Sequence, residues 1–300
     1  MKSLKNSVVI GLGMLLFACN TPVDQGKSTD TWHSYMHDQQ NTGVSGEELT
    51  FPLQLTWERA FQNPPQPAWP APAKQDYYNG KRKLEPLVTY DRVFQPVVVG
   101  NRLFLASSAN NSIACYDVLN GELIWKFYSG APNRVAPLWY KGKLFVGSDD
   151  GHIYCLNAEN GELQWKRSFG GDRKMMGNGR IISSVPVRTG IVAKGDTIFV
   201  AAGLLPEENV SVNACKASTG DVIWSRQLTE LAPQGYPVLM DSLWYVPNSR
   251  VQPMVFSTRN GELSHRLKGD GGDNVSVIDG RIVSGVDWKG ELNAKRLLES

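Results

Sequence analysis

The sequence predicts an all-β protein assembled from repeated four-stranded antiparallel units. The first reason is a repeat: SIACYDVLNGELIW, ending at Trp125, recurs as HIYCLNAENGELQW, ending at Trp165. The second is the alternation of short Val, Ile, Leu and aromatic runs with tight-turn pairs such as Lys141-Gly142. A period of about 40 residues with four strands per period is typical of a propeller blade. We therefore expect a β-propeller with about five blades, the last one incomplete.

The N-terminus has the pattern of a targeting segment. Lys2 and Lys5 precede an apolar run, Val8 to Ala18, that is short for a membrane span. Leu16 to Cys19 (LFAC) resembles a bacterial lipobox, which implies removal of residues 1–18 and acylation of Cys19. Asn20 follows in place of Asp, and by the same resemblance this favours the outer membrane. The alternative is a plain secretory signal with a chance cysteine.

Composition adds limits rather than a function. Residues 19–31 are polar and suit a flexible tether, so the propeller is expected over 32–300. The chain has 300 residues, 41% of them hydrophobic and 20% charged, as in ordinary soluble globular proteins. A net charge of +2 gives no argument for nucleic acid or for an anionic membrane surface. We expect membrane contact through the lipid anchor alone.

Two early stretches differ in kind from the repeats. Leu53 to Phe61 (LQLTWERAF) alternates apolar and polar residues and resembles the strand ends LIWKFYS and LQWKRSF. We predict that it forms the outer strand of a split first blade. Residues 62–90 include five prolines between positions 64 and 72, around Trp69, and such density cannot pair inside a sheet. This insertion is expected to be a surface loop, either a lid or docking loop or a spacer.

The later units depart from the repeat in three places. Trp224 follows Trp165 by more than one period, and we expect the extra residues in 169–182 and 203–210. The fourth unit has His265 where a tryptophan is expected. The fifth stops before its last turn and outer strand. The chain is then a fragment, which we favour, or its N-terminal strand completes the last blade, or a partner supplies further blades.

The recurring stretch resembles the pyrroloquinoline-quinone-type repeat of the quinoprotein alcohol dehydrogenase-like superfamily. The residues that carry the resemblance are ACYDVLNGELIW, CLNAENGELQW and ACKASTGDVIW. The resemblance implies that each tryptophan packs between neighbouring blades and that each turn glycine closes a hairpin. The expected structural set is Trp57, Gly121, Trp125, Gly161, Trp165, Gly220, Trp224 and Gly261. Cys115, Cys155 and Cys215 are expected to be small buried apolar residues, with a disulfide as the alternative.

This repeat occurs in two groups with different functions. One group comprises quinone-dependent dehydrogenases, which hold Ca²⁺ with Glu, Asn and Asp beside a vicinal cysteine pair. The other comprises non-enzymatic lipoproteins, such as the propeller component of the outer-membrane β-barrel assembly machine. No Cys-Cys pair is present, and Glu207-Glu208-Asn209 and Asp149-Asp150 lack the spacing of a calcium loop. We therefore expect no catalytic residue, metal or cofactor; pyrroloquinoline quinone and Ca²⁺ belong to the alternative, a periplasmic alcohol or sugar dehydrogenase.

The best candidate for a binding surface is the enlarged third unit. Arg173, Lys174, Arg180 and Arg188 lie around Met175-Met176 and two glycines. Long loops on a propeller gather on one face and carry function more often than blades do. We expect a lipid-anchored envelope scaffold that binds protein partners through these face loops. The four basic residues are its candidate partner-binding residues. The alternative for this loop is a solvated surface without a partner.

Overall fold

The computed structural model describes residues 31–68, 93–229, 233–248, 251–268, 274–285 and 293–296. The predicted signal peptide, Cys19, the tether up to residue 30 and most of the 62–90 insertion lie outside these ranges. Within them, no helix is long and apolar enough to cross a membrane. The one helix of the described residues is a short 3-10 turn, Pro206–Glu208.

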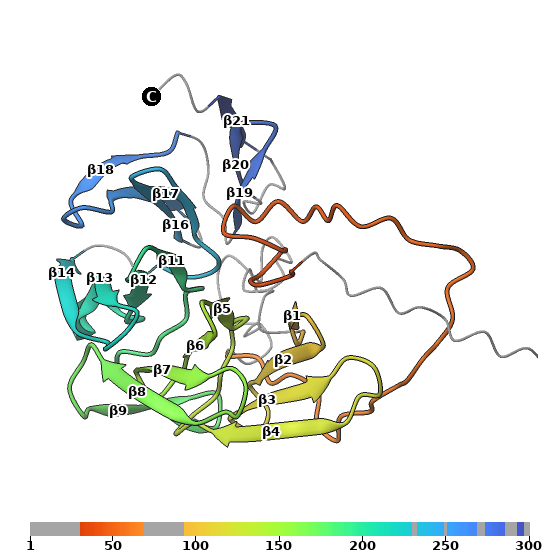
Figure 1. Ribbon diagram of the computed structural model, residues 1–300. Coiled ribbons are helices and arrows are strands. Elements are labelled where there is room, and N and C mark those ends of the chain that lie inside the picture. Colours follow the sequence, from red (N-terminus) through yellow and green to blue (C-terminus); the bar gives the residue numbers. More distant parts are fainter. Residues whose placement is uncertain are drawn as a thin grey trace, which may run out of the picture.

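The prediction of a propeller built from four-stranded antiparallel blades is confirmed. Blades 1 to 4 each have four strands in sequence order, and blade 5 has three (Figure 1). Blade 1 is β1 (Val97–Val99), β2 (Arg102–Ser107), β3 (Ser112–Asp117) and β4 (Leu123–Tyr128). Blade 2 is β5 (Leu138–Tyr140), β6 (Lys143–Gly147), β7 (His152–Asn157) and β8 (Leu163–Ser168).

The remaining strands follow the same order, with one addition. Blade 3 is β11 (Val192–Lys194), β12 (Thr197–Ala202), β13 (Val210–Lys216) and β14 (Val222–Leu228). Blade 4 is β15 (Val238–Met240), β16 (Leu243–Asn248), β17 (Val251–Ser257) and β18 (Leu263–Arg266). Blade 5 is β19 (Asn274–Ile278), β20 (Arg281–Gly285) and β21 (Asn293–Arg296). Between blades 2 and 3, β9 (Lys174–Gly177) and β10 (Arg180–Ser183) form a separate hairpin.

Turn chemistry fixes the strand boundaries within each blade. Lys141 and Gly142 join β5 to β6 with φ values of 49° and 76°, and Gly100, Gly195 and Gly280 also have positive φ at the matching turns. Two positive φ angles in a two-residue loop give a turn whose twist matches that of the flanking strands. The turn pairs recognised in the sequence therefore lie at the tips of hairpins.

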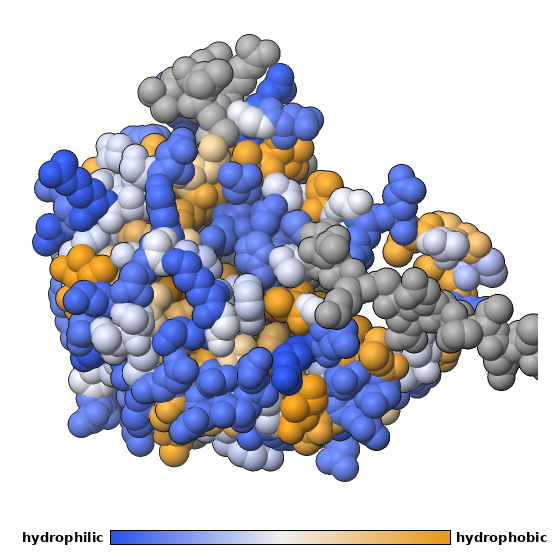
Figure 2. Space-filling model, in the orientation of Figure 1, coloured by the Kyte–Doolittle hydropathy of each residue, from blue (hydrophilic) through white to orange (hydrophobic). Residues whose placement is uncertain are grey.

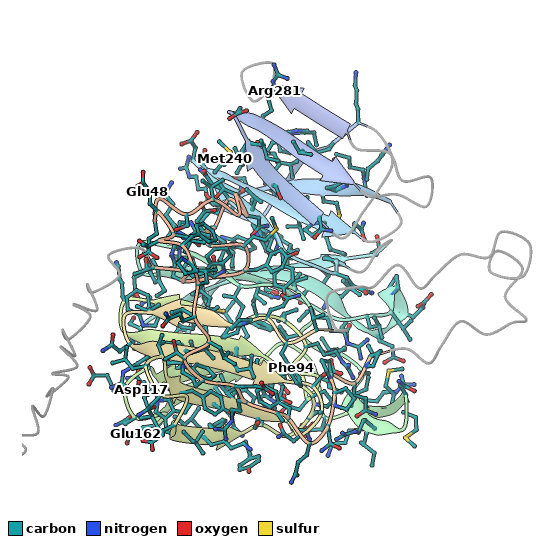
Figure 3. All side chains as sticks on the ribbon, turned by 90° about the vertical axis from the view of Figure 1, so that its right-hand side faces the viewer. Glu48, Phe94, Asp117, Glu162, Met240 and Arg281 are labelled. Carbon is teal, nitrogen blue, oxygen red and sulfur yellow. The ribbon has the colours of Figure 1, made fainter. Side chains whose placement is uncertain are left out.

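The core lies between blades rather than inside any one of them. Phe104, Ile113 and Cys115 of blade 1 face Leu144 and Leu156 of blade 2, and all five are fully buried. Equivalent clusters join blade 2 to blade 3, blade 3 to blade 4, and blade 4 to blade 5. Figure 3 shows the resulting succession, with Asp117 and Glu162 in neighbouring blades at one end and Arg281 of blade 5 at the other. Each blade is thus stabilised mainly by its neighbours.

A tryptophan on the outer strand repeats across the first three of these interfaces, and His265 takes its position in β18 of blade 4. The ring of Trp125 lies over Gly161 of the next blade, and its indole N–H donates to Ala158 O at 3.1 Å. Trp165 does the same with Gly220 and Ala217 O, and Trp224 with Gly261 and Thr258 O. Because the ring covers the Cα of the glycine, a side chain there would collide with it. The motif glycine therefore serves the turn and the blade interface together.

The segment 32–41 crosses the hub and pairs with the innermost strand of every blade. Backbone N–H groups at equivalent strand positions donate to its carbonyl oxygens: Val98 to Trp32, Trp139 to His33, Leu239 to Gln39 and Val277 to Gln40, at 2.8 to 3.0 Å. In blade 3, Ala193 N–H donates to the side-chain oxygen of Gln39. One short segment thereby satisfies an inner-edge donor in all five blades.

The blades do not close into a ring within the described residues. Blade 5 packs on blade 4, and no sheet or core cluster joins it to blade 1. From the hub, the red-orange segment of Figure 1 runs along the open side and reaches blade 1 near β4. Its exposed apolar side chains contribute to the right-hand edge in Figure 2.

Candidate functional site

The hairpin β9–β10 carries the predicted basic surface, and two of the four basic residues remain exposed on it. Arg173 precedes β9, has a side chain that is 72% exposed, and forms an ion pair with Glu208. Lys174 begins β9 and is exposed. Glu208 belongs to the second predicted insertion, 203–210, so this ion pair joins the two enlarged loops of the third unit.

Arg180 serves as an anchor for the N-terminal segment. Its guanidinium donates to Gln66 Oε1 at 2.9 Å, to Ala109 O at 2.5 Å and to Asn111 Oδ1 at 3.4 Å. Asn178, in the turn of the same hairpin, donates to Pro67 O at 2.7 Å. The hairpin therefore holds residues 66 and 67 against blade 1, and Arg180 has little freedom to bind a partner.

Arg188 lies in the interior and not on this surface. Its Nε and a terminal nitrogen donate to the two oxygens of Asp149 at 2.8 and 3.1 Å. Arg134 Nε donates to the same carboxylate at 2.5 Å, and Arg134 also donates to Gln66 O. All three ionic side chains are at most 5% exposed. This buried cluster joins the loops before β5 and β11 to the turn after β6.

The hairpin also presents an apolar pair that the residue pattern indicated only in part. Met176 and Ile181 are direct cross-strand partners and are 70% and 66% exposed. Ile182, on the other face, is buried and anchors the hairpin. Met175-Met176 stood out in the sequence, but the pairing with Ile181 depends on the hairpin register. The exposed pair with Arg173 and Lys174 beside it is called the hairpin patch.

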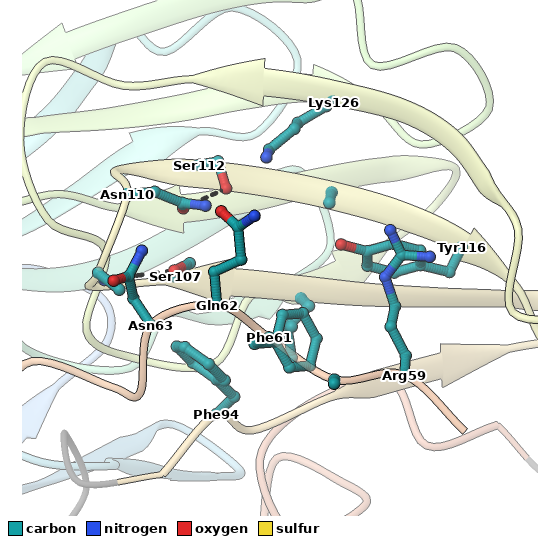
Figure 4. Close-up of a pocket in the computed structure, with 14 residues that line it drawn as sticks. Arg59, Phe61, Gln62, Asn63, Phe94, Ser107, Asn110, Ser112, Tyr116 and Lys126 are labelled. Atoms are coloured by element: carbon teal, nitrogen blue, oxygen red, sulfur yellow. Dashed lines mark hydrogen bonds between the residues drawn. The ribbon is translucent and has the colours of Figure 1, made fainter.

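A second concave site lies on the open side of blade 1. A cavity of about 300 Å³ separates residues 59–63 from the face of β2, β3 and β4 that points away from blade 2 (Figure 4). Phe61 and Phe94 form one wall, and Arg59 stacks over the ring of Tyr116 at 4.5 Å. Lys126 lies above Gln62 and Ser112 in the same view. We call this cavity the front groove; sequence patterns gave no indication of it.

The described residues contain no set of donors that fits a metal-bound quinone. No three His, Cys, Asp or Glu side chains gather as possible metal ligands in the described part of the chain. Glu207 and Glu208 lie in the 3-10 turn, where Glu208 pairs with Arg173. Asp149 is occupied by two arginines and Asp150 by the hydroxyl of Tyr154. The described residues therefore do not fit a Ca²⁺ site.

The three described cysteines are free thiols in the core. Cys115 and Cys155 lie directly opposite Trp125 and Trp165 in their sheets. Burial raises the pKa of Cys155 and of Cys215 to about 12 and also raises that of Cys115. A thiol with so high a pKa is a poor nucleophile at neutral pH. Their environment is that of small apolar packing residues.

Comparison with known proteins agrees with this architecture. The family model described as outer membrane protein assembly factor BamB matches residues 56–294. A search of curated proteins found no match. Among solved structures, the chain is similar to BamB from Moraxella catarrhalis, with a TM-score of 0.50 and 16% identity over 66% of this chain and 56% of that one.

Quinoprotein dehydrogenases are similar as well. A europium-containing methanol dehydrogenase gives a TM-score of 0.56 at 13% identity, covering 89% of this chain and 58% of that one. Quinohemoprotein alcohol dehydrogenase from Comamonas testosteroni gives 0.54 at 15% identity, covering 89% and 49%. This chain spans about half the length of these structures, and identities this low establish the fold alone. With a family match over most of its length and the repeated Trp-on-Gly packing between blades, the chain belongs to the BamB family of quinoprotein-like β-propellers.

Proposed function

We propose that the protein is a non-catalytic binding scaffold of the bacterial cell envelope that contacts a partner protein through the hairpin patch. The observation that carries this proposal is the exposed cross-strand pair Met176 and Ile181 on a hairpin that is held in place. Two large apolar side chains at that exposure lose water only when a partner covers them. The family name, an outer membrane assembly factor, supports an envelope location and a protein partner.

The chemistry of the patch specifies the partner in outline. Lys174 and Arg173 lie beside the apolar pair, and methionine adapts its shape to varied apolar surfaces. A complementary surface has an apolar centre with acidic residues at its rim, which would steer association and orient it. Acylation at Cys19, as the lipobox resemblance implies, would keep the propeller at the outer membrane, facing the periplasm or the cell surface.

The proposal is tested by site-specific crosslinking in the envelope of the host cell. A photoreactive residue replaces Met176 in the full chain, and a matched variant carries it at Ile278, which is 49% exposed on blade 5. We expect a discrete adduct with an envelope protein from position 176 and none from 278. The adduct should weaken when Lys174→Glu is added. Equal labelling from both positions, or none from either, would contradict the proposal.

The alternative function, a quinone-dependent dehydrogenase, has its own test. The purified protein is mixed with pyrroloquinoline quinone and Ca²⁺, and dye-linked oxidation of alcohols and sugars is followed with the absorbance of bound quinone. The scaffold proposal expects neither a bound chromophore nor dye reduction above the protein-free control. Dye reduction that depends on both quinone and protein would replace the scaffold with the enzyme.

A further inference from the structure

The hairpin that carries the hairpin patch is joined to no blade by a sheet among the described strands. β9 and β10 pair with each other, and a two-stranded hairpin is only marginally stable by itself. Its base is held by the core, because Ile182 is 1% exposed and Ser183 N–H donates to Asp149 O at 2.8 Å. The exposed pair, Met176 and Ile181, lies one step closer to the tip. The orientation of this pair therefore also depends on what fixes the tip.

The tip is held by residues 64–68, which we call the strap. Asn178, in the hairpin turn, donates to Pro67 O at 2.7 Å. Arg180 Nε donates to Gln66 Oε1 at 2.9 Å. The hairpin register puts both contacts on the tip side of the exposed apolar pair. The pair is thus fixed from both directions, by a buried base and by a tip that the strap holds.

The strap is itself anchored to the blades. Gln66 N–H donates to Ser108 Oγ, just after β2, at 2.9 Å. Arg134, from the loop before β5, donates to Gln66 O. Ala68 is 3% exposed. Every polar group of Gln66 that contacts the body of the protein therefore meets a different element, and the strap connects the hairpin tip to blades 1 and 2.

Upstream of the strap, the chain is fixed to blade 1 a second time. The indole N–H of Trp57 donates to Val118 O at 2.6 Å, and its ring lies over Gly121. Arg59 donates to Gly121 O at 3.0 Å. A strap that leaves the hairpin therefore stays attached to blade 1 through these contacts and is able to dock again.

The sequence of the strap suits reversible docking. Pro64, Pro65 and Pro67 have a fixed φ near −65°, and a proline also biases the residue before it toward an extended conformation. Such a segment has little conformational freedom to lose when it docks. Its contacts with the hairpin are two hydrogen bonds in partly buried positions, where water competes with them. Docking is therefore inexpensive in entropy and also easily undone.

We propose that docking of the strap orders the hairpin and presents the hairpin patch to its partner, so that release of the strap lowers the affinity of the patch. Partner binding and strap docking then favour each other to the same extent, because coupling between two equilibria is reciprocal. Arg180 is a positioning residue in this arrangement, since it acts on the partner through the hairpin. The inference rests on the proposed function and adds a means of regulating the same site.

Hydrogen exchange of the purified full chain tests whether the strap orders the hairpin. Gln66→Ala removes the acceptor of Arg180. Asn178→Gly removes the donor to Pro67 and keeps a residue that accepts the positive φ of 44° at this position. In each variant, the protected amides of β9 and β10 should exchange at least about threefold faster, whereas those of β13 should not change. Gln54→Ala, an exposed change outside the strap, is the control and should exchange as the native chain does.

Crosslinking from position 176 in the host envelope tests the link to the partner. Gln66→Ala should lower the yield of the adduct at least about threefold, although residue 66 is not part of the patch. Arg180→Lys should lower it as well, because a lysine keeps the charge but cannot reproduce the forked contacts of the guanidinium. The double variant should lose much less than the product of the two single losses, since both changes undo the same contact. Gln54→Ala should give the native yield.

Each contrary result has a distinct meaning. Native exchange rates in both Gln66→Ala and Asn178→Gly would show that the strap does not order the hairpin. Faster exchange with an undiminished adduct would break the link between the strap and the partner. A native yield in Arg180→Lys, with loss in Arg180→Ala, would make Arg180 a charge that the partner meets directly. An adduct that is missing already in the native chain would contradict the scaffold proposal instead, and the exchange rates would still decide whether the strap orders the hairpin.

Discussion

At the scale of single residues, the repeat encodes a contact between neighbours. Gly161 has a φ of +73°, and a Cβ there would lie 2.5 Å from Cε3 of Trp125. Glycine is therefore required twice at this position, once for the backbone and once for the ring that covers it. Gly142, in the hairpin turn of the same blade, has a φ of +76° with nothing within 4 Å of a Cβ. A side chain at Gly142 would therefore meet backbone strain alone, whereas one at Gly161 would meet both backbone strain and the ring of Trp125.

Substitution of each glycine by alanine should measure the two effects separately. Gly142→Ala should lower the free energy of unfolding by about 1–2 kcal/mol, the cost of a left-handed conformation for an L-residue. Gly161→Ala should lower it by about 1–3 kcal/mol more, because the methyl group also displaces Trp125. Denaturant unfolding of the two variants and the native chain is the measurement. Equal losses would show that the indole moves aside without cost.

The residue pattern predicted these contacts only in kind. Spacing alone indicated that a glycine recurs in four units and a tryptophan in the first three, and family resemblance supplied the expectation of packing between blades. Which glycine meets which tryptophan depends on how one blade is placed on the next. The partner of Trp57 is the clearest case, because the sequence between residues 57 and 121 contains no feature that pairs the two.

At the scale of elements, the way the inserted residues fold decides which of the basic residues can meet a partner. Spacing placed extra residues at 169–182, and the structure makes them a hairpin with its own register. Arg180 and Arg188 are both arginines in the same stretch of the sequence, but their side chains lie in different environments. One anchors Gln66 and Ala109, and the other is buried against Asp149. A count of charges along a loop could not separate them, because burial depends on where the hairpin packs.

Removing the carboxylate from the buried cluster should be strongly destabilising. Asp149→Ala leaves Arg134 and Arg188 buried without their shared counter-ion, and breaking a buried pair in this way costs about 3–5 kcal/mol. Asp221→Ala is the control, because its pair with Arg167 is 3.6 Å long and 62% exposed on the carboxylate side. That change should cost about 1 kcal/mol or less.

Thermal and denaturant unfolding of the two variants give the comparison. Similar small losses for both would show that water reaches the Asp149 cluster and screens it. The hairpin should also loosen in Asp149→Ala, because Ser183 N–H donates to the backbone carbonyl of Asp149, and residue 149 then loses the two arginine contacts that hold it in place. Hydrogen exchange in β10 reports that local effect.

At the scale of the whole molecule, the hub segment sets the arrangement of the blades. Residues 32–41 are hydrogen-bonded to the innermost strands of all five blades, and the outer tryptophans fix successive blades at the periphery. Asn41 contributes to the hub by donating to Val275 O at 2.8 Å and Tyr236 O at 3.3 Å. Hydrogen bonds at the hub therefore hold blades 1 and 5 in the same assembly although no described sheet joins them directly.

Asn41→Ala should weaken the connection of blade 5 to the hub. Asn41 is 4% exposed, and its loss leaves buried carbonyl groups unsatisfied, at a cost of about 1–3 kcal/mol. We expect faster hydrogen exchange in β19 and little change in β3 or β7. The control is Gln40→Ala, whose side chain is exposed and whose backbone carbonyl still accepts from Val277. Uniformly faster exchange in all blades would argue against a local role.

The sequence by itself determined the blade as a unit: its four strands, its turns, and the residues that recur at its interfaces. These features are local, because a turn pair or an alternating run specifies its own conformation within a few residues. Tertiary structure alone decided that segment 32–41 crosses the hub, that Trp57 lies over Gly121, and that Arg188 is buried while Met176 is exposed. Those outcomes join residues far apart in the chain, and they follow from how blades pack around a shared centre, which no local pattern encodes.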